Sequence, residues 1–362
     1  MTLIAAYNHS GCGLVIGDIL ISGRVNEASR PQIRLPTQGN VSGFFKGSFG
    51  IRKPVQKVCI VSDDCAIAWA GRLDYARTFV SRLKRISGRI KITKNIIARL
   101  FQKCGYNDLQ ITGAIHEDGY LQTFGLNCEH LICPILGEIY AGGSGASAVH
   151  DYVRIVKEMN LGQSGEDEAG ARGVSLALTQ VAHLLNAEFR KGKAADSIRE
   201  FFGGGYEIAA YYGGKFRKVS ANFVFLDVGF QEGYLKIGYP TLVISQSYCG
   251  ETLRYQVLSP SGPDNSRIRR NETIEIPPLV READDHSAPF VGELTSFACF
   301  VFVDDFRFLG KQLVSTIVIS DTPPFRYSVV NSKLNVLYSD DAERHIKKFL
   351  VSHYRSEGSS II

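Results

Sequence analysis

The stretch Met1-Thr2-Leu3-Ile4-Ala5-Ala6-Tyr7 places a threonine directly before an apolar run that is typical of a strand. Loss of one methionine would make Thr2 the N-terminal residue. A threonine with a free amine carries a hydroxyl nucleophile and a base on one residue, so it needs no histidine to activate it. Because threonine is also common in strands, the interpretation depends on whether the rest of the chain supplies partners for such a nucleophile.

Length and composition limit the class of protein. The 362 residues exceed one ordinary core, so two domains are expected, and 44% hydrophobic with 21% charged residues is typical of a soluble globular chain. No apolar run reaches the roughly eighteen residues of a membrane span, and the N-terminus lacks a signal-peptide pattern. The formal charge of +5 is mild and its basic clusters are interpreted as solvated faces, so neither a membrane nor a nucleic acid is expected as a partner.

The cysteines and histidines indicate a reducing compartment and no metal. Eight cysteines are spread through the chain without a CxxC pair, and several lie in apolar runs such as Val58-Cys59-Ile60-Val61. We interpret them as buried thiols of a cytoplasmic protein. The eight histidines show no metal-ligand spacing, and no cofactor is expected.

Hydrophobic periodicity divides residues 1–219 into two blocks of strands, each followed by a pair of helices. This order predicts antiparallel sheets covered by helices on their outer faces, an α+β arrangement rather than a βαβ alternation. A polar segment at 26–54, rich in Gly, Pro and Arg, is expected to be a loop or insertion. The expected strands are 3–7, 13–22, 57–62, 64–70, 109–116, 119–126, 136–141, 206–212 and 216–219, and the expected helices are about 73–86, 93–104 (with Thr93 as N-cap), 146–159 and 166–190.

The pattern changes at about residue 220. Short strand-like runs separated by turns predict an all-β domain over 220–362, a sandwich or a small barrel. A helix is expected at about 341–354, followed by a frayed tail around 358–360. The expected strands are 222–228, 241–247, 253–258, 273–277, 297–303, 314–319 and 326–330.

Five residues of the first domain are singled out by their places at the ends of the expected strands or in a turn. Thr2 begins the first strand, and Asp18 ends the second. Lys57 begins a later strand, Gly71 ends the next one, and Ser144 lies in the turn Gly143-Ser144-Gly145 before a helix.

In this order the chain resembles the catalytic β-subunits of proteasomes and their bacterial relatives, in the N-terminal-nucleophile (Ntn) hydrolase superfamily. Asp18 follows Thr2 by sixteen positions and Gly71 follows Lys57 by fourteen, as in that family. The 39 positions between Asp18 and Lys57 exceed the family's usual gap, and the segment 26–54 would absorb the difference. The resemblance covers about residues 2–219 and implies a four-layer αββα fold.

The resemblance implies a threonine peptidase or amidohydrolase acting on peptide or other amide bonds. The Thr2 hydroxyl would attack a carbonyl carbon, and the Thr2 amine would take its proton. Lys57, held by Asp18, would keep the local potential positive and so lower the pKa of the amine and hydroxyl. The Gly71 N–H would stabilise the oxyanion, and the Ser144 hydroxyl would bond the amine or a relay water.

Two positions need separate interpretation. The family's amine-orienting aspartate corresponds to Arg199 here, with Phe202 where a serine is usual, so we name Asp196 as the substitute carboxylate and Glu200 as the alternative. Trp69 stands where the family places the floor of the primary specificity pocket. A tryptophan there would favour small substrate side chains or block the pocket; the alternative is a core anchor.

Each of these residues also has an ordinary structural explanation. An Asp–Lys pair is commonly a surface salt bridge, Gly71 would suit a tight turn, and Ser144 would suit a helix N-cap. It is their joint order along the chain that favours the enzyme.

Two other interpretations stay open. The first is an inactive proteasome-like scaffold whose β-rich domain binds a protein partner; retention of Met1 would favour it, because Met1 blocks the amine. The second uses Cys12 as a nucleophile with His9 as its base. Because family members assemble into rings, a homo-oligomer is also expected. The C-terminal domain could cap such a ring, block it, recruit substrate or leave the protein a dimer.

Overall fold

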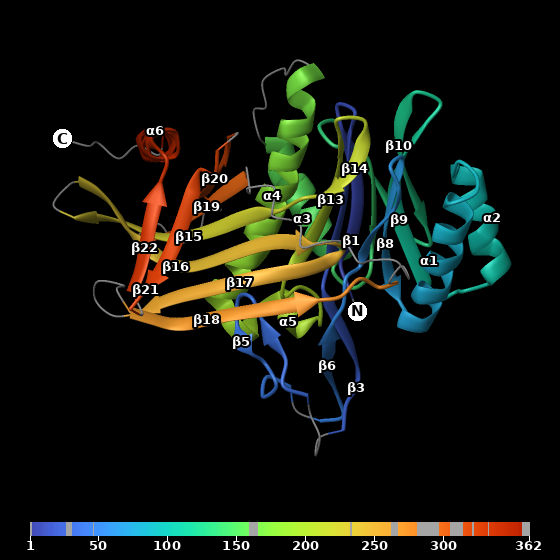
Figure 1. The fold of residues 1–362 in the computed structure, drawn as a ribbon, viewed down its shortest axis with the longest axis horizontal. Helices are drawn as coiled ribbons and strands as arrows, with labels where there is room; N and C mark the ends of the chain where they lie inside the picture. The colour runs from blue at the N-terminus through green and yellow to red at the C-terminus, as the bar shows by residue number, and fades with distance from the viewer. Residues whose placement is uncertain are drawn as a thin grey trace. The chain divides into compact units, whose positions relative to one another are not determined.

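The computed structural model divides the chain into two compact units, coloured by position along the chain in Figure 1. It describes residues 2–26, 31–45, 47–158, 166–231, 234–261, 267–280, 297–304, 314–320, 322–331 and 333–356. The first unit is Met1–Val219 with Ile276–His286, and the second is Ser220–Glu275 with Ser287–Ile362. Both contain helices and strands, so the class is α+β. The sequence did not indicate that the chain returns to the first unit at Ile276.

An antiparallel six-stranded sheet forms one half of the first unit. Its central hairpin, β1–β2, turns at Ser10 and Gly11, whose φ angles of 49° and 86° suit the tight turns of two-residue hairpins. The register pairs Ile4 with Gly17 and so brings the start of β1 beside the end of β2. The order is β11-β12-β1-β2-β13-β14, with bounds β1 Ile4–His9, β2 Cys12–Asp18, β11 Glu129–Cys133, β12 Gly137–Gly142, β13 Tyr206–Tyr212 and β14 Lys215–Lys218.

A four-stranded antiparallel sheet packs against the first through small side chains. Ala66, Ala68 and Ala114 of this sheet share a buried cluster with Ile4 and Val15 of the six-stranded sheet. Their short side chains allow the two backbones to approach closely at native packing density. The order is β10-β9-β8-β7, with bounds β7 Val58–Ser62, β8 Cys65–Gly71, β9 Leu109–Glu117 and β10 Tyr120–Leu126.

Helices pack on the outer faces of the two sheets. On the four-stranded sheet, Phe79 and Leu83 of α1 join Trp69 of β8 in one buried cluster. Thr93 caps α2 by accepting the Ile96 N–H at 3.2 Å, which confirms the predicted N-cap. On the six-stranded sheet, α3 packs against β1 and α4 against β2 and β13. The bounds are α1 Leu73–Ser87, α2 Lys94–Cys104, α3 Ala146–Glu158, α4 Glu166–Lys191, the 3-10 turn η2 Gly192–Ala194 and α5 Asp196–Arg199.

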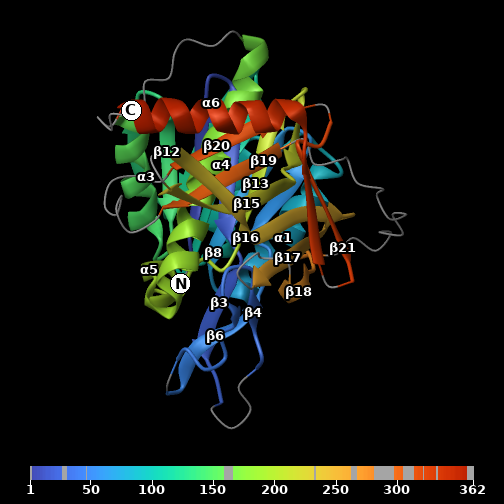
Figure 2. The same ribbon diagram turned by 90° about the vertical axis from the view of Figure 1, so that its left-hand side faces the viewer.

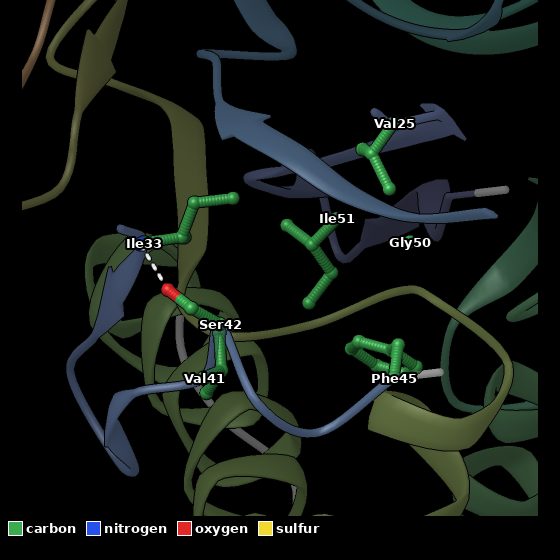
Figure 3. Close-up of a pocket in the computed structure, with 7 residues that line it drawn as sticks. All are labelled: Val25, Ile33, Val41, Ser42, Phe45, Gly50 and Ile51. Carbon is green, nitrogen blue, oxygen red and sulfur yellow. Dashed lines mark hydrogen bonds between the residues drawn. The ribbon is translucent and has the colours of Figure 1, made fainter. Parts of the chain in front are cut away.

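The segment between β2 and β7 forms two small β-ribbons, although a loop was expected over 26–54; the strand expected at 13–22 is divided between β2 and β3. Its apolar residues are scattered rather than alternating, so the pattern does not reveal them as strands. Phe45 stacks on Phe201 and Phe49 contacts it edge-on, with ring centroids 4.7 and 5.1 Å away, and so they hold the loop after α5. The ribbons are β3 (Leu20–Arg24) with β6 (Phe49–Pro54), and β4 (Arg34–Leu35) with β5 (Gly39–Asn40). A small pocket within the segment is lined by Val25, Ile33, Val41, Ser42, Phe45, Gly50 and Ile51 (Figure 3).

The second unit is a mixed six-stranded sheet with a hairpin and a terminal helix. Its order is β18-β17-β16-β15-β19-β20, and β15 and β19 are parallel. Ala342, Ile346 and Leu350 of α6 pack with Phe300 and Phe325 in the unit's core, and Figure 2 shows the helix α6 along its whole length. The bounds are β15 Ala221–Gln231, β16 Tyr234–Cys249, β17 Thr252–Ser261, β18 Arg267–Ile276, β19 Phe297–Asp304, β20 Val314–Ile319, β21 Phe325–Val330, β22 Lys333–Tyr338 and α6 Asp340–Ser356.

The helix expected at about 341–354 is confirmed as α6. The expected sandwich or small barrel over 220–362 is corrected to a mixed six-stranded sheet with the hairpin β21–β22, and α6 completes their core. The parallel pairing of β15 with β19 joins segments far apart in sequence, which periodicity does not show. The strands β11 and β22 were also not predicted, whereas the expected tail at 358–360 lies outside the described residues. None of the helices in the described part of the chain is long and apolar enough to cross a membrane.

Candidate active site

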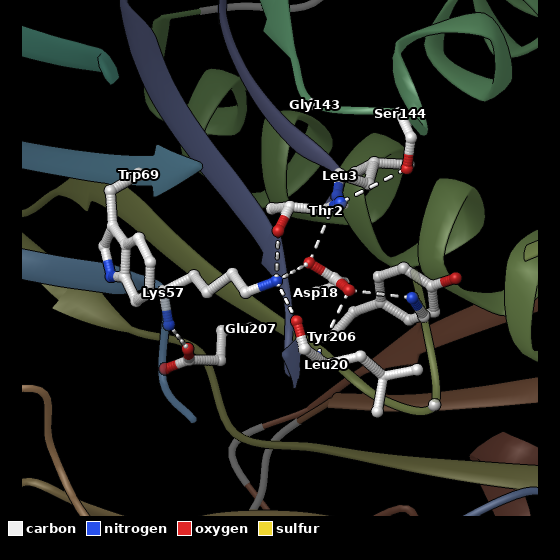
Figure 4. A network of polar contacts seen from close by, with 12 residues as sticks. Thr2, Leu3, Asp18, Leu20, Lys57, Trp69, Gly143, Ser144, Tyr206 and Glu207 are labelled. Atoms are coloured by element: carbon white, nitrogen blue, oxygen red, sulfur yellow. Dashed lines mark hydrogen bonds and ion pairs between the residues drawn. The ribbon is translucent and has the colours of Figure 1, made fainter. Parts of the chain in front are cut away.

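Thr2, Asp18 and Lys57 meet in the interior of the first unit (Figure 4). The β1–β2 register places Leu3 beside Asp18, and Leu3 N–H donates to Asp18 Oδ1 at 3.1 Å. Lys57 precedes β7 and reaches the same point from the four-stranded sheet. Its Nζ donates to Asp18 Oδ1 at 2.7 Å and to Thr2 Oγ1 at 2.6 Å, and also to the Leu20 carbonyl. The spacing seen in the sequence therefore becomes a set of direct contacts.

The cluster is withdrawn from solvent. Asp18 and Lys57 are fully buried and Thr2 is 3% exposed. Burial lowers the pKa of Lys57, while the neighbouring carboxylates of Asp18 and Glu207 act in the opposite direction. The Lys57 ammonium is thus held where its charge is costly, beside the hydroxyl that a nucleophilic mechanism must activate. The ordinary alternative, a surface salt bridge between Asp18 and Lys57, is excluded because both side chains are fully buried.

Backbone groups fix both members of the pair. Asp18 Oδ2 accepts Leu20 N–H at 3.2 Å and Gly203 N–H at 2.8 Å, so the carboxylate is held from two elements besides Lys57. The backbone N–H of Lys57 donates to Glu207 Oε2 at 2.6 Å. Glu207 is itself fully buried and pairs with Lys218. The Lys57 side chain therefore projects from an anchored backbone.

The Gly143-Ser144-Gly145 turn wraps around Thr2. Thr2 N–H donates to Ser144 Oγ at 3.3 Å, and the Ser144 hydroxyl donates to the Glu200 carbonyl at 3.0 Å. Gly145 N–H donates to the Thr2 carbonyl at 2.9 Å. Gly143 has a φ of +82°, and a Cβ there would lie 2.0 Å from the Thr2 carbonyl oxygen. The structure thus brings Ser144 to the Thr2 nitrogen, as the sequence predicts.

Gly71 is required at its position by the backbone. Its φ is +109°, and an added Cβ would meet the Asp108 carbonyl oxygen at 1.9 Å. A turn requirement alone accounts for glycine here. The oxyanion role of the Gly71 N–H stays a prediction.

Trp69 is a core anchor that also borders the cluster. Its side chain is fully buried, and its indole N–H donates to the Gln56 carbonyl at 3.3 Å. Lys57 Nζ lies 6.0 Å from the centroid of the ring, at the outer limit of a cation–π contact. The structure therefore favours the core interpretation of Trp69 over the floor of an open specificity pocket.

Asp196 is not placed for the role assigned to it. Its carboxylate is 70% exposed and pairs with Lys191 Nζ at 3.3 Å, whereas the cluster around Thr2 is buried. Asp196 lies in the first turn of α5, which is only four residues long. Its carboxylate could approach Thr2 only if this segment were shifted. The neighbouring Glu200 reaches Ser144 through its backbone carbonyl. We remove Asp196 from the candidate set.

The cysteine alternative fails on geometry and charge. Burial raises the pKa of the Cys12 thiol to about 12, so the thiolate is strongly disfavoured. The Cys12 Sγ lies 3.8 Å from the Gly170 carbonyl, and His9 Nδ1 lies 2.8 Å from the Ile135 carbonyl. The two side chains thus face backbone partners in different elements.

Three supporting residues were missed by the sequence reasoning. Glu207 holds the Lys57 backbone, Gly203 donates to Asp18, and Glu188 accepts from the turn that contains Gly203. The run Gly203-Gly204-Gly205 was visible as a strand boundary but carried no signal for a contact with Asp18. Among the described residues, no group of three or more His, Cys, Asp or Glu could hold a metal ion.

No protein-family model matches the chain, and no curated protein matches its sequence. The functional argument therefore depends on the geometry of the site.

Proposed function

We propose that the first unit is a threonine-type N-terminal-nucleophile hydrolase that cleaves peptide or other amide bonds once Thr2 is the N-terminal residue. The observation that carries the proposal is the buried contact of Lys57 Nζ with both Thr2 Oγ1, at 2.6 Å, and Asp18 Oδ1, at 2.7 Å. Two facing sheets with helices on their outer faces are consistent with the four-layer proteasome-like fold that such an enzyme would have.

The reaction would follow from these positions. Thr2 Oγ would form a bond to the carbonyl carbon of the substrate while its proton passes to the Thr2 amine. The resulting oxyanion would accept the Gly71 N–H, and its collapse would break the C–N bond as the ammonium returns the proton to the leaving amine. Water, deprotonated by the same amine, would then hydrolyse the ester on Thr2.

Lys57 and Ser144 would supply the electrostatics and the orientation. A buried ammonium 2.6 Å from the hydroxyl favours the alkoxide character that develops during attack. Ser144, which links the Thr2 nitrogen to the Glu200 carbonyl, would orient the free amine in the absence of a role for Asp196.

The proposal is tested by comparing the variants Thr2→Ala and Thr112→Val with the wild-type protein. Mass spectrometry first shows for each preparation that Met1 has been removed. Thr2→Ala should abolish hydrolysis of a peptide library. Thr112→Val is the matched control, because Thr112 is a fully buried sheet threonine whose hydroxyl bonds the Phe124 and Tyr140 carbonyls. Hydrolysis in Thr2→Ala equal to that of the Thr112→Val control would reject the mechanism.

A catalytically inactive scaffold is the second candidate. It is favoured by the 3% exposure of Thr2 and by the position of Asp196, whose exposed carboxylate pairs with Lys191. In this case the protein would act through assembly with copies of itself, or through a protein partner bound by the second unit. Intact-mass measurement separates the two candidates, because a retained Met1 blocks the amine and supports the scaffold.

A further inference from the structure

We propose that Glu188 is a positioning residue for the Asp18–Lys57 pair and acts through the Gly203-Gly204 turn. The catalytic part of this inference rests on the proposed function. Its structural part can be measured whether or not the protein is an active enzyme.

Glu188 lies near the end of α4 and collects hydrogen bonds from four separate elements. Its side chain is fully buried. Oε1 accepts the Ser197 hydroxyl at 3.0 Å and the Tyr206 hydroxyl at 2.9 Å, and Oε2 accepts the Thr37 hydroxyl at 2.9 Å. The Gly204 N–H lies 3.1 and 3.2 Å from the two oxygens. A buried carboxylate with this many donors fixes the position of every element that donates to it.

The turn is shaped to receive this carboxylate. Gly203 and Gly204 have φ angles of +93° and +73°, and a Cβ on Gly203 would lie 2.1 Å from Glu188 Oε1. Side chains are therefore excluded where the carboxylate approaches the backbone.

The same turn delivers a donor to the candidate site. Gly203 N–H donates to Asp18 Oδ2 at 2.8 Å, one residue before the Gly204 N–H that Glu188 holds. Tyr206, which also donates to Glu188, is the register partner of Asp18 in the sheet. The contacts thus run from Glu188 through the turn to Asp18 and then to Lys57 and Thr2.

Glu188 also attaches the inserted ribbons to this network. Thr37 donates to its carboxylate, and Gln38 Nε2 donates to its backbone carbonyl. The inserted segment, which lies between Asp18 and Lys57 in the sequence, therefore contacts Glu188 and helps to stabilise the turn that donates to Asp18.

Protonation of Glu188 should alter the turn near neutral pH. Burial raises the pKa of Glu188 to about 7, and its hydrogen-bond donors act against this rise. Of the groups that donate to the carboxylate, only the Tyr206 hydroxyl is titratable, and Asp18 and Lys57 lie beyond the turn. The Gly204 N–H acts to lower this pKa, so its hydrogen bond is stronger to the charged carboxylate. When Glu188 is protonated but stays buried, this bond weakens, and the Gly203 N–H that donates to Asp18 should be held less firmly at low pH.

Glu188→Gln tests the proposal, because it mimics the neutral acid with almost the same shape and the Thr37 hydroxyl can rotate to accept from the amide. Hydrogen exchange by mass spectrometry is followed on a peptide covering 201–206 between pH 5.5 and 8.5. In the wild-type protein, exchange corrected for its intrinsic pH dependence should be about tenfold faster at low pH than at high pH. Glu188→Gln should remove this dependence. Thr37→Val should move it to higher pH, because one hydrogen bond to the charged form is lost.

Tyr152→Phe is the matched control. Tyr152 of α3 is buried and donates to the Leu176 carbonyl of α4, the helix that carries Glu188. This variant should keep the wild-type dependence. A dependence that survives unchanged in Glu188→Gln, or that disappears equally in Tyr152→Phe, would overturn the proposal.

Activity distinguishes the positioning role from the proposed function itself. If the protein hydrolyses amides, Glu188→Gln should lower kcat about tenfold with little change in KM and lose the limb of the pH profile near 7. Unaltered kcat and pH profile in an active Glu188→Gln enzyme would overturn the catalytic role. If no hydrolysis is found while the exchange results hold, the proposed function fails and the structural role of Glu188 stands.

Discussion

Among the described residues of the first unit, two lysines pair with fully buried carboxylates, and the two pairs differ in what else their lysines contact. Lys57 and Asp18 are both fully buried, whereas Lys218 is 16% exposed and Glu207 fully buried. Lys57 Nζ also reaches the Thr2 hydroxyl at 2.6 Å. Lys218 Nζ reaches the Val58 carbonyl at 2.6 Å, on the first residue of β7.

The comparison teaches that a buried ion pair is not by itself a site. Burying two charges costs free energy that their attraction only partly recovers, so either pair requires an explanation. For Lys218–Glu207 the explanation is structural, because Glu207 and Lys218 bond the N–H groups and the carbonyl of the residues around the start of β7. For Lys57–Asp18 the added contact is a hydroxyl, and this contact is what points to chemistry.

Replacing each lysine by methionine tests whether the two pairs have different roles. Lys57→Met should lower hydrolysis at least about 10³-fold, because the charge beside the Thr2 hydroxyl is lost. Burial raises the pKa of Asp18, so the unpaired carboxyl can become neutral and the fold should survive. Steady-state kinetics and circular dichroism check this. Retention of more than a tenth of the activity would contradict the assignment of Lys57.

Lys218→Met should show the opposite behaviour. It leaves Glu207 buried with its backbone donors but without a cation, which should lower the free energy of unfolding by about 3 kcal/mol. The kcat of the folded fraction should stay within about twofold of wild type. Urea denaturation and kinetics below the transition measure the two effects. A loss of kcat as large as that of Lys57→Met would show that the pairs are not distinct.

A third buried carboxylate, Glu188, sharpens the comparison because its described partners include no lysine. Its pKa is raised by burial from 4.5 to about 7. The folded state therefore binds more protons than the unfolded state between these values, so stability should fall as pH rises from about 4.5 to 7 and level off above 7. The shift corresponds to at most about 3 kcal/mol. The difference in unfolding free energy between wild type and Glu188→Gln, measured across this range, should show this slope, and a flat difference would contradict it.

Ser144→Ala should have the smallest effect. It removes one hydroxyl that accepts the Thr2 N–H and donates to the Glu200 carbonyl, which should cost about 1 kcal/mol of stability. Hydrolysis should fall about tenfold, because the amine loses orientation while Lys57 and Asp18 keep their places. Thermal unfolding and kinetics measure both, and a loss equal to that of Lys57→Met would place Ser144 in the role assigned to the lysine.

Much of the first unit could be predicted from the sequence because its signals are local. The strands of the β1–β2 hairpin follow from their apolar runs and the turn between them, and the Thr93 cap follows from side-chain chemistry. The hairpin register places Leu3, the residue after Thr2, beside Asp18. Lys57 was predicted as a partner from its place in the order of residues along the chain. In the structure its Nζ contacts both Thr2 and Asp18.

The parts that were missed depend on contacts between distant segments. Glu188 is one charged residue on a long helix, and nothing in its neighbours in sequence marks it as buried. Asp196 was chosen for its residue type and approximate position, but a short exposed helical turn directs it to Lys191. The parallel pairing in the second unit and the ribbons of the inserted segment likewise depend on partners that periodicity does not identify.

The central claim is that Thr2 is a nucleophile activated by Lys57. It is tested most directly by treating protein with a free Thr2 amine with a β-lactone, which adds to a nucleophile without a leaving group, and by mapping the adduct with mass spectrometry. The account predicts a single ester on Thr2 in wild type and in Lys218→Met, and none in Lys57→Met over the same time. An adduct on another residue, or equal labelling of Thr2 in Lys57→Met, would contradict it.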